Sequence, residues 1–308
     1  MQTSSQQQAT ATLEVIKNYF MDLQDRICAG LEEEDGKASF EEDKWERPGG
    51  GGGRSRVIAN GKVFEKGGVN FSHVFGEMPE AITQKLGLSA KVHFDAMGVS
   101  LVIHPESPRV PIVHMNVRYF QTGDGTHWFG GGIDLTPIYV VPEDATHFHK
   151  VLKSACDPFG EHKYPEFKAW CDRYFFLKHR NETRGIGGIF FDHLKASNDE
   201  EKAENFAFVR SVGDAFLDAY RPIVAKSKTL PYQDSHKNWQ LLRRSRYVEF
   251  NLVYDKGTKF GLDTNGRTES ILMSMPPLAA WKYNYQPEDD SEEAFTQAHL
   301  KPLDWLSI

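Results

Sequence analysis

The sequence is short of cysteine, of long apolar runs and of positive charge, and each shortage excludes a class of protein. Its three cysteines, Cys28, Cys156 and Cys171, are too few and too scattered for a disulfide framework or a zinc ribbon, which favours a reducing compartment. No apolar run approaches the roughly 20 residues that a membrane-spanning helix requires, so we expect no stable membrane insertion. The formal net charge of -7 argues against a nucleic-acid partner, because phosphate binding needs a surplus of Lys and Arg.

The two ends of the chain lack the usual targeting signals. Residues 1–16 contain neither Lys nor Arg and no apolar block, unlike a secretory signal or a mitochondrial transit peptide. The last three residues, Leu306, Ser307 and Ile308, are not a peroxisomal signal. We therefore expect a cytosolic protein, with one domain over 1–308 and a flexible tail at 1–10.

A nucleotide-binding motif is also missing. Residues 45–56 read WERPGGGGGRSR, which fits neither the P-loop nor the GxGxxG pattern that opens a helix. The five consecutive glycines and the cations Arg54 and Arg56 leave two interpretations open. The segment is either a flexible loop that closes over an anion or a mobile linker.

The most informative stretch that is present runs from Ile112 to Phe120, and its residues separate by parity. Successive side chains of a strand point to opposite faces, so the apolar odd positions face one side. The polar even positions, His114, Asn116 and Arg118, face the other. A rise of about 3.3 Å per residue sets His114 and Arg118 roughly 13 Å apart, which suits a wide ligand with several polar groups.

Similar patterns along the chain predict an α+β fold. Strand-like runs separated by turns such as Asn60-Gly61 predict an antiparallel meander in the first half. The acidic run 32–35 is typical of a solvated loop or helix end. Apolar residues at intervals of three and four predict helices at 13–31, 142–155, 165–180 and 200–220. In the last third, alternation predicts a return to strand at 246–255 and 271–275.

Twelve histidines make a metal site one hypothesis. Four of them could supply imidazole ligands to a divalent transition metal, namely His104, His114, His149 and His179. No HExxH or comparably tight spacing holds them together, and scattered histidines are usually core or surface groups. Both interpretations stay open at this stage.

Several charged residues are candidates for binding and acid–base chemistry. Arg118, Arg267 and the Arg243–Arg246 cluster can receive carboxylates, because guanidinium presents a rigid fork to an anion. They can equally pair with the Asp and Glu of the chain. Asp134 and Asp255 are either turn residues or acid–base groups that accept a polarised N–H.

Seven segments in order give the chain a close family resemblance. They read WERPGGGGGRSRV, GVNFSHVFG, HMNVRYF, WFGGGIDLTP, LKHRNETRGIGGIFFD, RYVEFNLVYDKGTKFGL and GRTESILMSMPP. Together they resemble the oxygen-dependent coproporphyrinogen III oxidases from about Leu13 to Trp305. The resemblance implies a large, mostly antiparallel sheet flanked by helices on both faces, with the active cleft between sheet and helices.

It also implies the reaction. Two propionates of coproporphyrinogen III are oxidatively decarboxylated to vinyls, giving protoporphyrinogen IX in haem biosynthesis. Molecular oxygen is the co-substrate, no organic cofactor is required, and a divalent metal is possible without being essential. The family forms homodimers, and 247–282 corresponds to the segment assigned to the interface.

The resemblance assigns roles to single residues. His114 matches the proton donor, and Asp134 lies in the GGGxDLTP motif. The family's usual YDRG reads Tyr254-Asp255-Lys256-Gly257 here, so lysine keeps the charge but loses the fork. The substrate-contacting positions are Ser100, Asn116, Val117, Arg118, Asn265, Gly266 and Arg267. The metal ligands proposed for bacterial members match His104, His114, His149 and His179.

These roles combine into a mechanistic hypothesis with two alternatives. Asp255, or else Asp134, holds a pyrrole N–H and helps remove its proton, the electron-rich ring reduces oxygen, and Arg118 positions the propionate that loses carbon dioxide. The alternatives are a metal-dependent oxygenase built on the four histidines and a tetrapyrrole carrier that binds without reacting.

Overall fold

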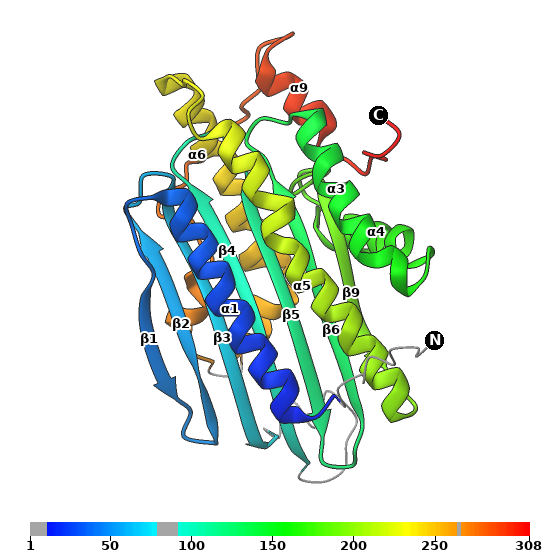
Figure 1. Cartoon of the computed structure of the whole chain (residues 1–308). Helices are drawn as coiled ribbons and strands as arrows, with labels where there is room; N and C mark the ends of the chain where they lie inside the picture. The colour runs from blue at the N-terminus through cyan, green and yellow to red at the C-terminus, as the bar shows by residue number, and fades with distance from the viewer. Residues whose placement is uncertain (1–10, 79–91, 264–265) are drawn as a thin grey trace.

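A seven-stranded antiparallel sheet forms the centre of the molecule (Figure 1). The computed structural model of the chain describes residues 11–78, 92–263 and 266–308. The sheet has the order β1-β2-β3-β4-β5-β6-β9, so only β9 departs from sequence order, after a long excursion through helices. Its strands are β1 (Glu41–Glu46), β2 (Gly51–Ala59), β3 (Phe64–Glu77), β4 (His93–Pro105), β5 (Ile112–Thr122), β6 (His127–Thr136) and β9 (Gly187–Lys195).

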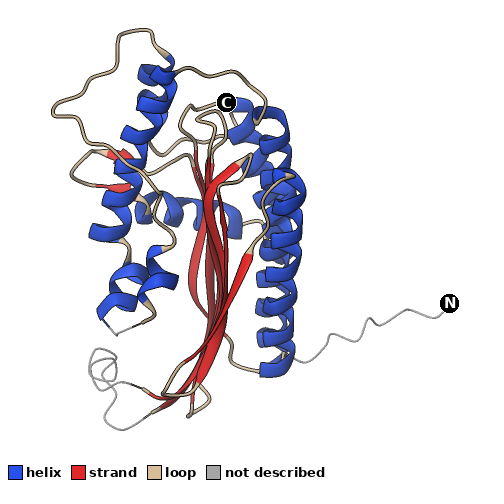
Figure 2. Ribbon diagram, turned by 90° about the vertical axis from the view of Figure 1, so that its left-hand side faces the viewer, coloured by secondary structure: helices blue, strands red, loops and turns tan. Residues whose placement is uncertain are grey.

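Helices cover both faces of this sheet, which confirms the predicted α+β fold. Figure 2 shows the sheet edge-on between two helical layers. One layer contains α1 (Leu13–Asp35), α3 (Pro142–Cys156) and α5 (Asp199–Ser227). The other contains α6 (Asp234–Glu249) and the turns that follow it, η2 (Phe250–Tyr254), α7 (Lys256–Asp263) and α8 (Thr268–Leu272). The remaining elements are η1 (Asp157–Phe159), α4 (Lys163–Tyr174), β7 (Phe176–Leu177), β8 (Glu182–Thr183) and α9 (Glu292–His299).

The main core lies between the sheet and the first helical layer. The odd residues of β5, Val113, Met115, Val117 and Tyr119, are at most 1% exposed and belong to it. Burying each such side chain contributes about 1.5–3 kcal/mol, so a register slip of one residue would be costly. This confirms the parity prediction and leaves the even residues of β5 for the other face. Within the described ranges, no helix combines the length and apolar character needed to span a bilayer.

The predicted return to strand in the last third is wrong. Residues 246–255 form the end of α6 and the π-helical turn η2, and 271–275 begin in α8. The buried residues Tyr247, Phe250 and Asn251 recur at intervals of three and one, whereas Leu252 and Val253 are both exposed. Alternating residue types therefore concealed a helical burial pattern, because tertiary packing overrides β propensity. The predicted helix 165–180 also ends early, at Tyr174.

Neither interpretation of the glycine-rich segment is correct. Residues 51–59 form β2, hydrogen-bonded between β1 and β3. A Cβ on Gly52 would lie 2.2 Å from the carbonyl oxygen of Trp45, so glycine permits the close strand approach. Arg54 and Arg56 both point to α1, where each forms an ion pair with Asp25, so the segment is a paired strand tied to a helix.

The acidic run 32–35 ends α1, and its last residue is buried rather than solvated. The Asp35 carboxylate accepts hydrogen bonds from five backbone N–H groups, those of Lys37, Ala38, Lys62, Val63 and Phe64. Burial alone would raise the pKa of Asp35, but these donors lower it below its ordinary value. Asp35 thus ties the end of α1 to the β2–β3 hairpin.

Asp35→Ala is therefore expected to reduce the free energy of unfolding by about 2–4 kcal/mol at pH 7, because five donors lose their acceptor. A lowered pKa gives stability that is present above the unfolded value, 3.8, and is lost as pH falls through the lower folded value. The difference between variant and wild type should shrink in acid. Urea unfolding at pH 7 and pH 3 measures this. Glu33→Ala, at an exposed position of the same run, is the control; an equal loss at both pH values would contradict the account.

Candidate active site

A row of polar residues crosses the face of the sheet opposite the main core. Neighbouring strands place these residues directly opposite one another, and opposite residues share a face. We call this set the polar row; from β1 to β5 its members are Asp43, Ser55, Asn70, Ser100 and Asn116, and Gly132 lies next in line on β6. With about 4.8 Å between strands, Ser55 and Asn116 lie roughly 14 Å apart.

A chain of polar contacts runs along β5 at one end of the polar row. His114 Nε2 lies 3.4 Å from Asn116 Nδ2, and Arg118 Nη1 lies 3.5 Å from Asn116 Oδ1. Arg118 Nη2 pairs with Asp192 Oδ2 on β9 at 2.8 Å. The structure therefore brings His114, Asn116 and Arg118 together on one face, as the parity of β5 predicted.

His114 is oriented from behind by a buried carboxylate. Its Nδ1 lies 2.7 Å from Asp134 Oδ1, and Asp134 is the register partner of His114 on β6. Arg184 Nη2 donates to both oxygens of Asp134 at 2.8 Å. Asp134 is 1% exposed and Arg184 is 2% exposed, so this ion pair is closed to solvent. Nε2 of His114 is left facing the polar row.

The surroundings of the Asp134–Arg184 pair keep Asp134 negatively charged. Burial alone would raise the pKa of Asp134, but the Arg184 charge and the hydrogen bond from His114 lower it below its ordinary value. The guanidinium lies over three aromatic rings, with its carbon 4.1 Å from the centroid of Phe175, 4.6 Å from Tyr247 and 4.9 Å from Phe250. A cation among ring faces is stabilised where water is excluded. Asp134 is therefore an anion that can hold the His114 imidazole in one orientation.

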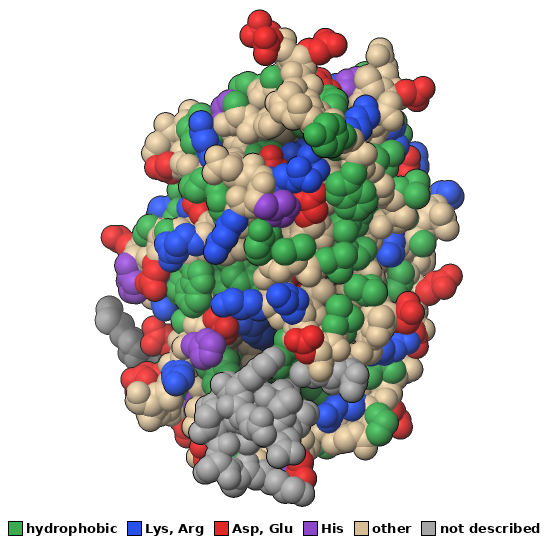
Figure 3. All heavy atoms as spheres, turned by 180° about the vertical axis from the view of Figure 1, so that it is seen from behind, with side chains coloured by type: hydrophobic (Ala, Val, Ile, Leu, Met, Phe, Trp, Pro, Cys, Tyr) green, Lys and Arg blue, Asp and Glu red, His purple; other side chains and the backbone are tan. Residues whose placement is uncertain are grey.

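Glycines leave space above this face of the sheet, because they carry no side chain. Gly98 and Gly130 lie opposite Arg118, and Gly132 lies opposite Asn116. A Cβ on Gly130 would lie 2.5 Å from Asp192 Oδ1 and 2.9 Å from Arg118 Nε. Figure 3 views the molecule from this side and shows Lys and Arg side chains around a hollow. This face therefore offers an anionic ligand cations around the hollow and few side-chain atoms beneath it.

Arg118 and Arg267 already have carboxylate partners. Arg118 pairs with Asp192, and Arg267 pairs with Asp43 at the far end of the polar row. Arg267 also donates to Ser55 Oγ at 3.3 Å. Both can keep one protein carboxylate and still present N–H groups, since each guanidinium has five donors.

Asp255 has a structural task besides any chemical one. It follows η2, and its Oδ2 accepts hydrogen bonds from the N–H and the hydroxyl of Thr258. Asp255 thereby caps the first turn of α7. Tyr174 donates to Asp255 Oδ1 at 2.8 Å. Burial lowers the pKa of Arg184, but the charges of Asp134 and Asp255 raise it above the ordinary value, so Asp255 acts on the same buried cation. Lys256 is exposed beside it.

The four histidines are not brought together. His104 Nε2 bonds the carbonyl of Ser274, and burial lowers the pKa of His104 to about 3. His149 lies on α3, in the helical layer that also contains α1 and α5, between the Tyr164 hydroxyl and the Ile186 carbonyl. His179 bonds Glu249 and Tyr254. Among the residues that the structure describes, no group of three or more His, Cys, Asp or Glu is arranged to hold a metal, so the four-histidine set does not fit a metal ion.

The remaining residues that were predicted to contact the substrate differ in whether the structure places their side chains at the site. Ser100 is exposed in the polar row, whereas the Val117 side chain is buried in the main core, so only its backbone borders the site. Gly266 donates to the Gly261 carbonyl at 2.8 Å, and Asn265 lies outside the described residues. No pattern in the sequence singles out Arg184 or Asp192, although both lie in the conspicuous RGIGGIFFD run.

Comparison with known families identifies the family of the chain. A family model described as coproporphyrinogen III oxidase matches residues 15–305. The chain belongs to the coproporphyrinogen III oxidase family. It is an oxidoreductase of haem biosynthesis that oxidatively decarboxylates coproporphyrinogen III. Two arginines lie beside the polar row, Arg118 next to Asn116 and Arg267 next to Asp43.

Proposed function

We propose that the polar row binds coproporphyrinogen III and that the His114–Asp134–Arg184 array works on the propionate held at Arg118. The observation that carries this is the contact chain from buried Arg184 through Asp134, His114 and Asn116 to Arg118. It sets a cation for the carboxylate beside an imidazole whose orientation is fixed. Arg267 would hold another carboxylate across the row.

Each residue has a defined task in this proposal. Asp255 accepts the pyrrole N–H and assists its deprotonation, which makes the ring electron-rich. Each propionate loses carbon dioxide and one hydrogen from the carbon next to the ring, leaving a vinyl group. Molecular oxygen takes up the two electrons and two protons and leaves as hydrogen peroxide. His114 supplies a proton through Nε2, and Asp134 stabilises its orientation throughout.

No organic cofactor enters this scheme, and no step is routed through a metal. The test is a product assay: coproporphyrinogen III is supplied under air, and products are separated by chromatography. The tricarboxylate and dicarboxylate should appear in sequence, and they should appear equally in a preparation treated with chelator. Binding without products would instead identify a carrier, and loss of turnover with chelator would restore a metal-dependent reaction.

Arg118→Lys is expected to raise KM by about ten-fold, corresponding to ~1.4 kcal/mol, with a smaller change in kcat. Lysine keeps the charge, but it cannot bond Asp192 and a substrate carboxylate with one planar fork. Steady-state kinetics with coproporphyrinogen III measures the effect. Arg26→Lys, which alters a carboxylate-paired arginine on α1, is the matched control; an unchanged KM for Arg118→Lys would exclude it as a carboxylate receptor.

We further propose a cytosolic homodimer whose interface includes 247–282. Large apolar side chains exposed in this segment support it, namely Leu252, Val253, Phe260, Leu262, Leu278 and Trp281. Sedimentation velocity should give twice the chain mass, and Leu278→Glu should shift the protein towards monomer. Leu230→Glu, at an exposed leucine outside the segment, should not. A wild-type monomer would exclude the dimer, and cell fractionation tests the compartment.

A further inference from the structure

A π-helical turn lies directly before Asp255. The Asp255 N–H donates to the carbonyl of Phe250 at 3.0 Å, five residues back, instead of the i−4 bond of an α-helix. Such turns are rare and concentrate at functional sites, because the wider turn re-aims the residues that follow. In an α-helical register the Asp255 N–H would donate to the Asn251 carbonyl instead. Side-chain contacts can favour one register over the other.

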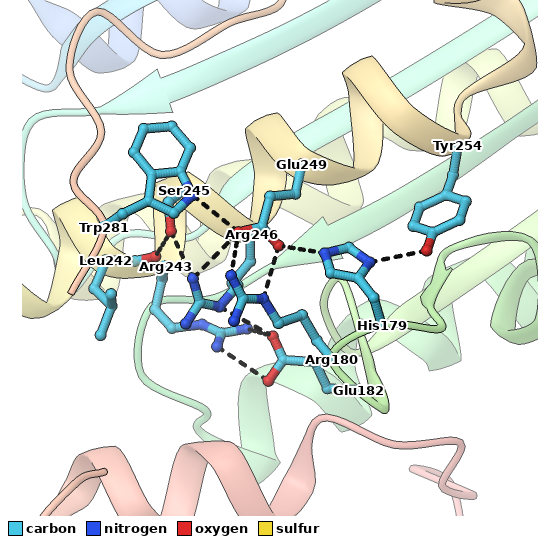
Figure 4. A network of polar contacts seen from close by, with 10 residues as sticks. All are labelled: His179, Arg180, Glu182, Leu242, Arg243, Ser245, Arg246, Glu249, Tyr254 and Trp281. Atoms are coloured by element: carbon cyan, nitrogen blue, oxygen red, sulfur yellow. Dashed lines mark hydrogen bonds and ion pairs between the residues drawn. The ribbon is translucent and has the colours of Figure 1, made fainter. Parts of the chain in front are cut away.

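His179 bridges the two ends of the π turn. Its Nε2 lies 2.7 Å from Glu249 Oε2, and its Nδ1 lies 2.9 Å from the Tyr254 hydroxyl (Figure 4). In an α-helix, positions five apart stand about 140° from one another around the axis. In a π turn, which closes with an i→i+5 bond, positions five apart come closer to the same side of the axis. The observed register therefore brings Glu249 and Tyr254 to the side where the imidazole from the β7–β8 turn contacts both.

The Glu249 end of this bridge is fixed independently. Arg180 donates to its two oxygens at 2.9 and 2.6 Å, and Trp281 Nε1 donates at 2.9 Å (Figure 4). Burial alone would raise the pKa of Glu249, but the hydrogen bonds from Arg180 and His179 lower it to about 2. Glu249 is thus a charged anchor on α6, and His179 ties Tyr254 to it.

We propose that His179 is a positioning residue that selects the π register of η2 and so aims the Asp255 carboxylate at the substrate. The inference rests on the role of Asp255 proposed above. His179 touches neither substrate nor reacting atoms in this account. The ring also stacks on Tyr254, at 5.5 Å between centroids and 29° between planes, so its two nitrogens must be tested apart from its ring.

Three variants make that separation. His179→Phe keeps a stacked ring but removes both nitrogens, so kcat should fall roughly ten- to a hundred-fold, as misplaced groups do, with KM within about two-fold. His179→Gln offers an amide N–H for Glu249 and an amide oxygen for Tyr254, and it should recover most of kcat. His147→Phe removes a histidine whose Nε2 bonds the Asp218 carbonyl on the other helical layer, and it should leave kcat unchanged.

A second readout does not depend on turnover. Amide hydrogen exchange over 250–255, supported by a crystal structure of His179→Phe, should show the Asp255 N–H released from Phe250, while His179→Gln retains that bond. Wild-type kcat and wild-type exchange in His179→Phe would overturn the proposal. Equal losses in the Phe and Gln variants would overturn it too. If the unaltered protein yields no product, the proposed function fails, and the exchange result still decides the register claim.

Discussion

Asp134→Asn is expected to lower kcat by roughly a thousand-fold or more, the scale seen when the carboxylate that orients a catalytic histidine becomes an amide. In the amide, one of the two carboxylate oxygens becomes an NH2 group, which donates and cannot accept. Arg184 Nη2 donates to both oxygens of Asp134 at 2.8 Å, so this NH2 group would face a donor. The free energy of unfolding should also fall by about 3–5 kcal/mol, because Arg184 would become a buried cation without a charged partner.

Two further variants separate the chemical loss from the structural one. His114→Phe removes the imidazole but leaves the Asp134–Arg184 pair, so kcat should fall to a similar level with a smaller loss of stability. Asp95→Asn alters a comparable pair on the opposite face of the sheet, where His73 Nε2 lies 3.0 Å from Asp95 Oδ1. It should leave kcat near wild type. Steady-state rates and urea unfolding measure all three, and a similar kcat loss in Asp95→Asn would refute a special role for Asp134.

Asp255→Asn should remove most turnover, by roughly a hundred- to ten-thousand-fold, while leaving folding nearly intact. Asparagine still accepts from the Thr258 N–H, so the start of α7 stays capped, but it cannot take a proton from the pyrrole. Asp255→Ala should lose turnover equally and also about 1 kcal/mol of stability, because the cap is gone.

The control for the capping effect is Ser291→Ala, which removes the N-cap that accepts from Ala294 at the start of α9. It should cost about 1 kcal/mol with no change in kcat. Product formation and thermal unfolding are the measurements. Wild-type rates in Asp255→Asn would remove Asp255 from the mechanism, whatever the alanine variant did.

The site face could be predicted because burial on one side of β5 imposes a strict alternation. Val113, Met115 and Val117 must enter the core, and this alone fixes where His114 and Arg118 point. The partners of these residues could not be predicted in the same way. Arg184 reaches Asp134 across 50 residues, and only the pairing of β6 with β9 brings the two together.

The last third resisted prediction for a different reason. Arg243 and Arg244 are buried on α6, which places charges where an amphipathic helix should show apolar residues. Each has a carboxylate partner distant in sequence, Glu182 and Glu65 respectively. The π turn then interrupts the spacing of buried residues that an α-helix would show. The alternation of residue types in YVEFNLVYD therefore resembles the pattern of a strand.

Gly130 and Gly132, which lie opposite Arg118 and Asn116, limit how mutation can reshape the binding surface of this enzyme. A cavity lined by side chains can be enlarged by trimming them, but Gly130 and Gly132 have nothing left to trim. Any replacement adds atoms, and at Gly132 the first one would lie 2.8 Å from the Ile189 carbonyl oxygen and 3.1 Å from Phe190. Mutation at these positions can narrow the binding surface but cannot widen it, so acceptance of bulkier macrocycles would have to arise in the helical layer above.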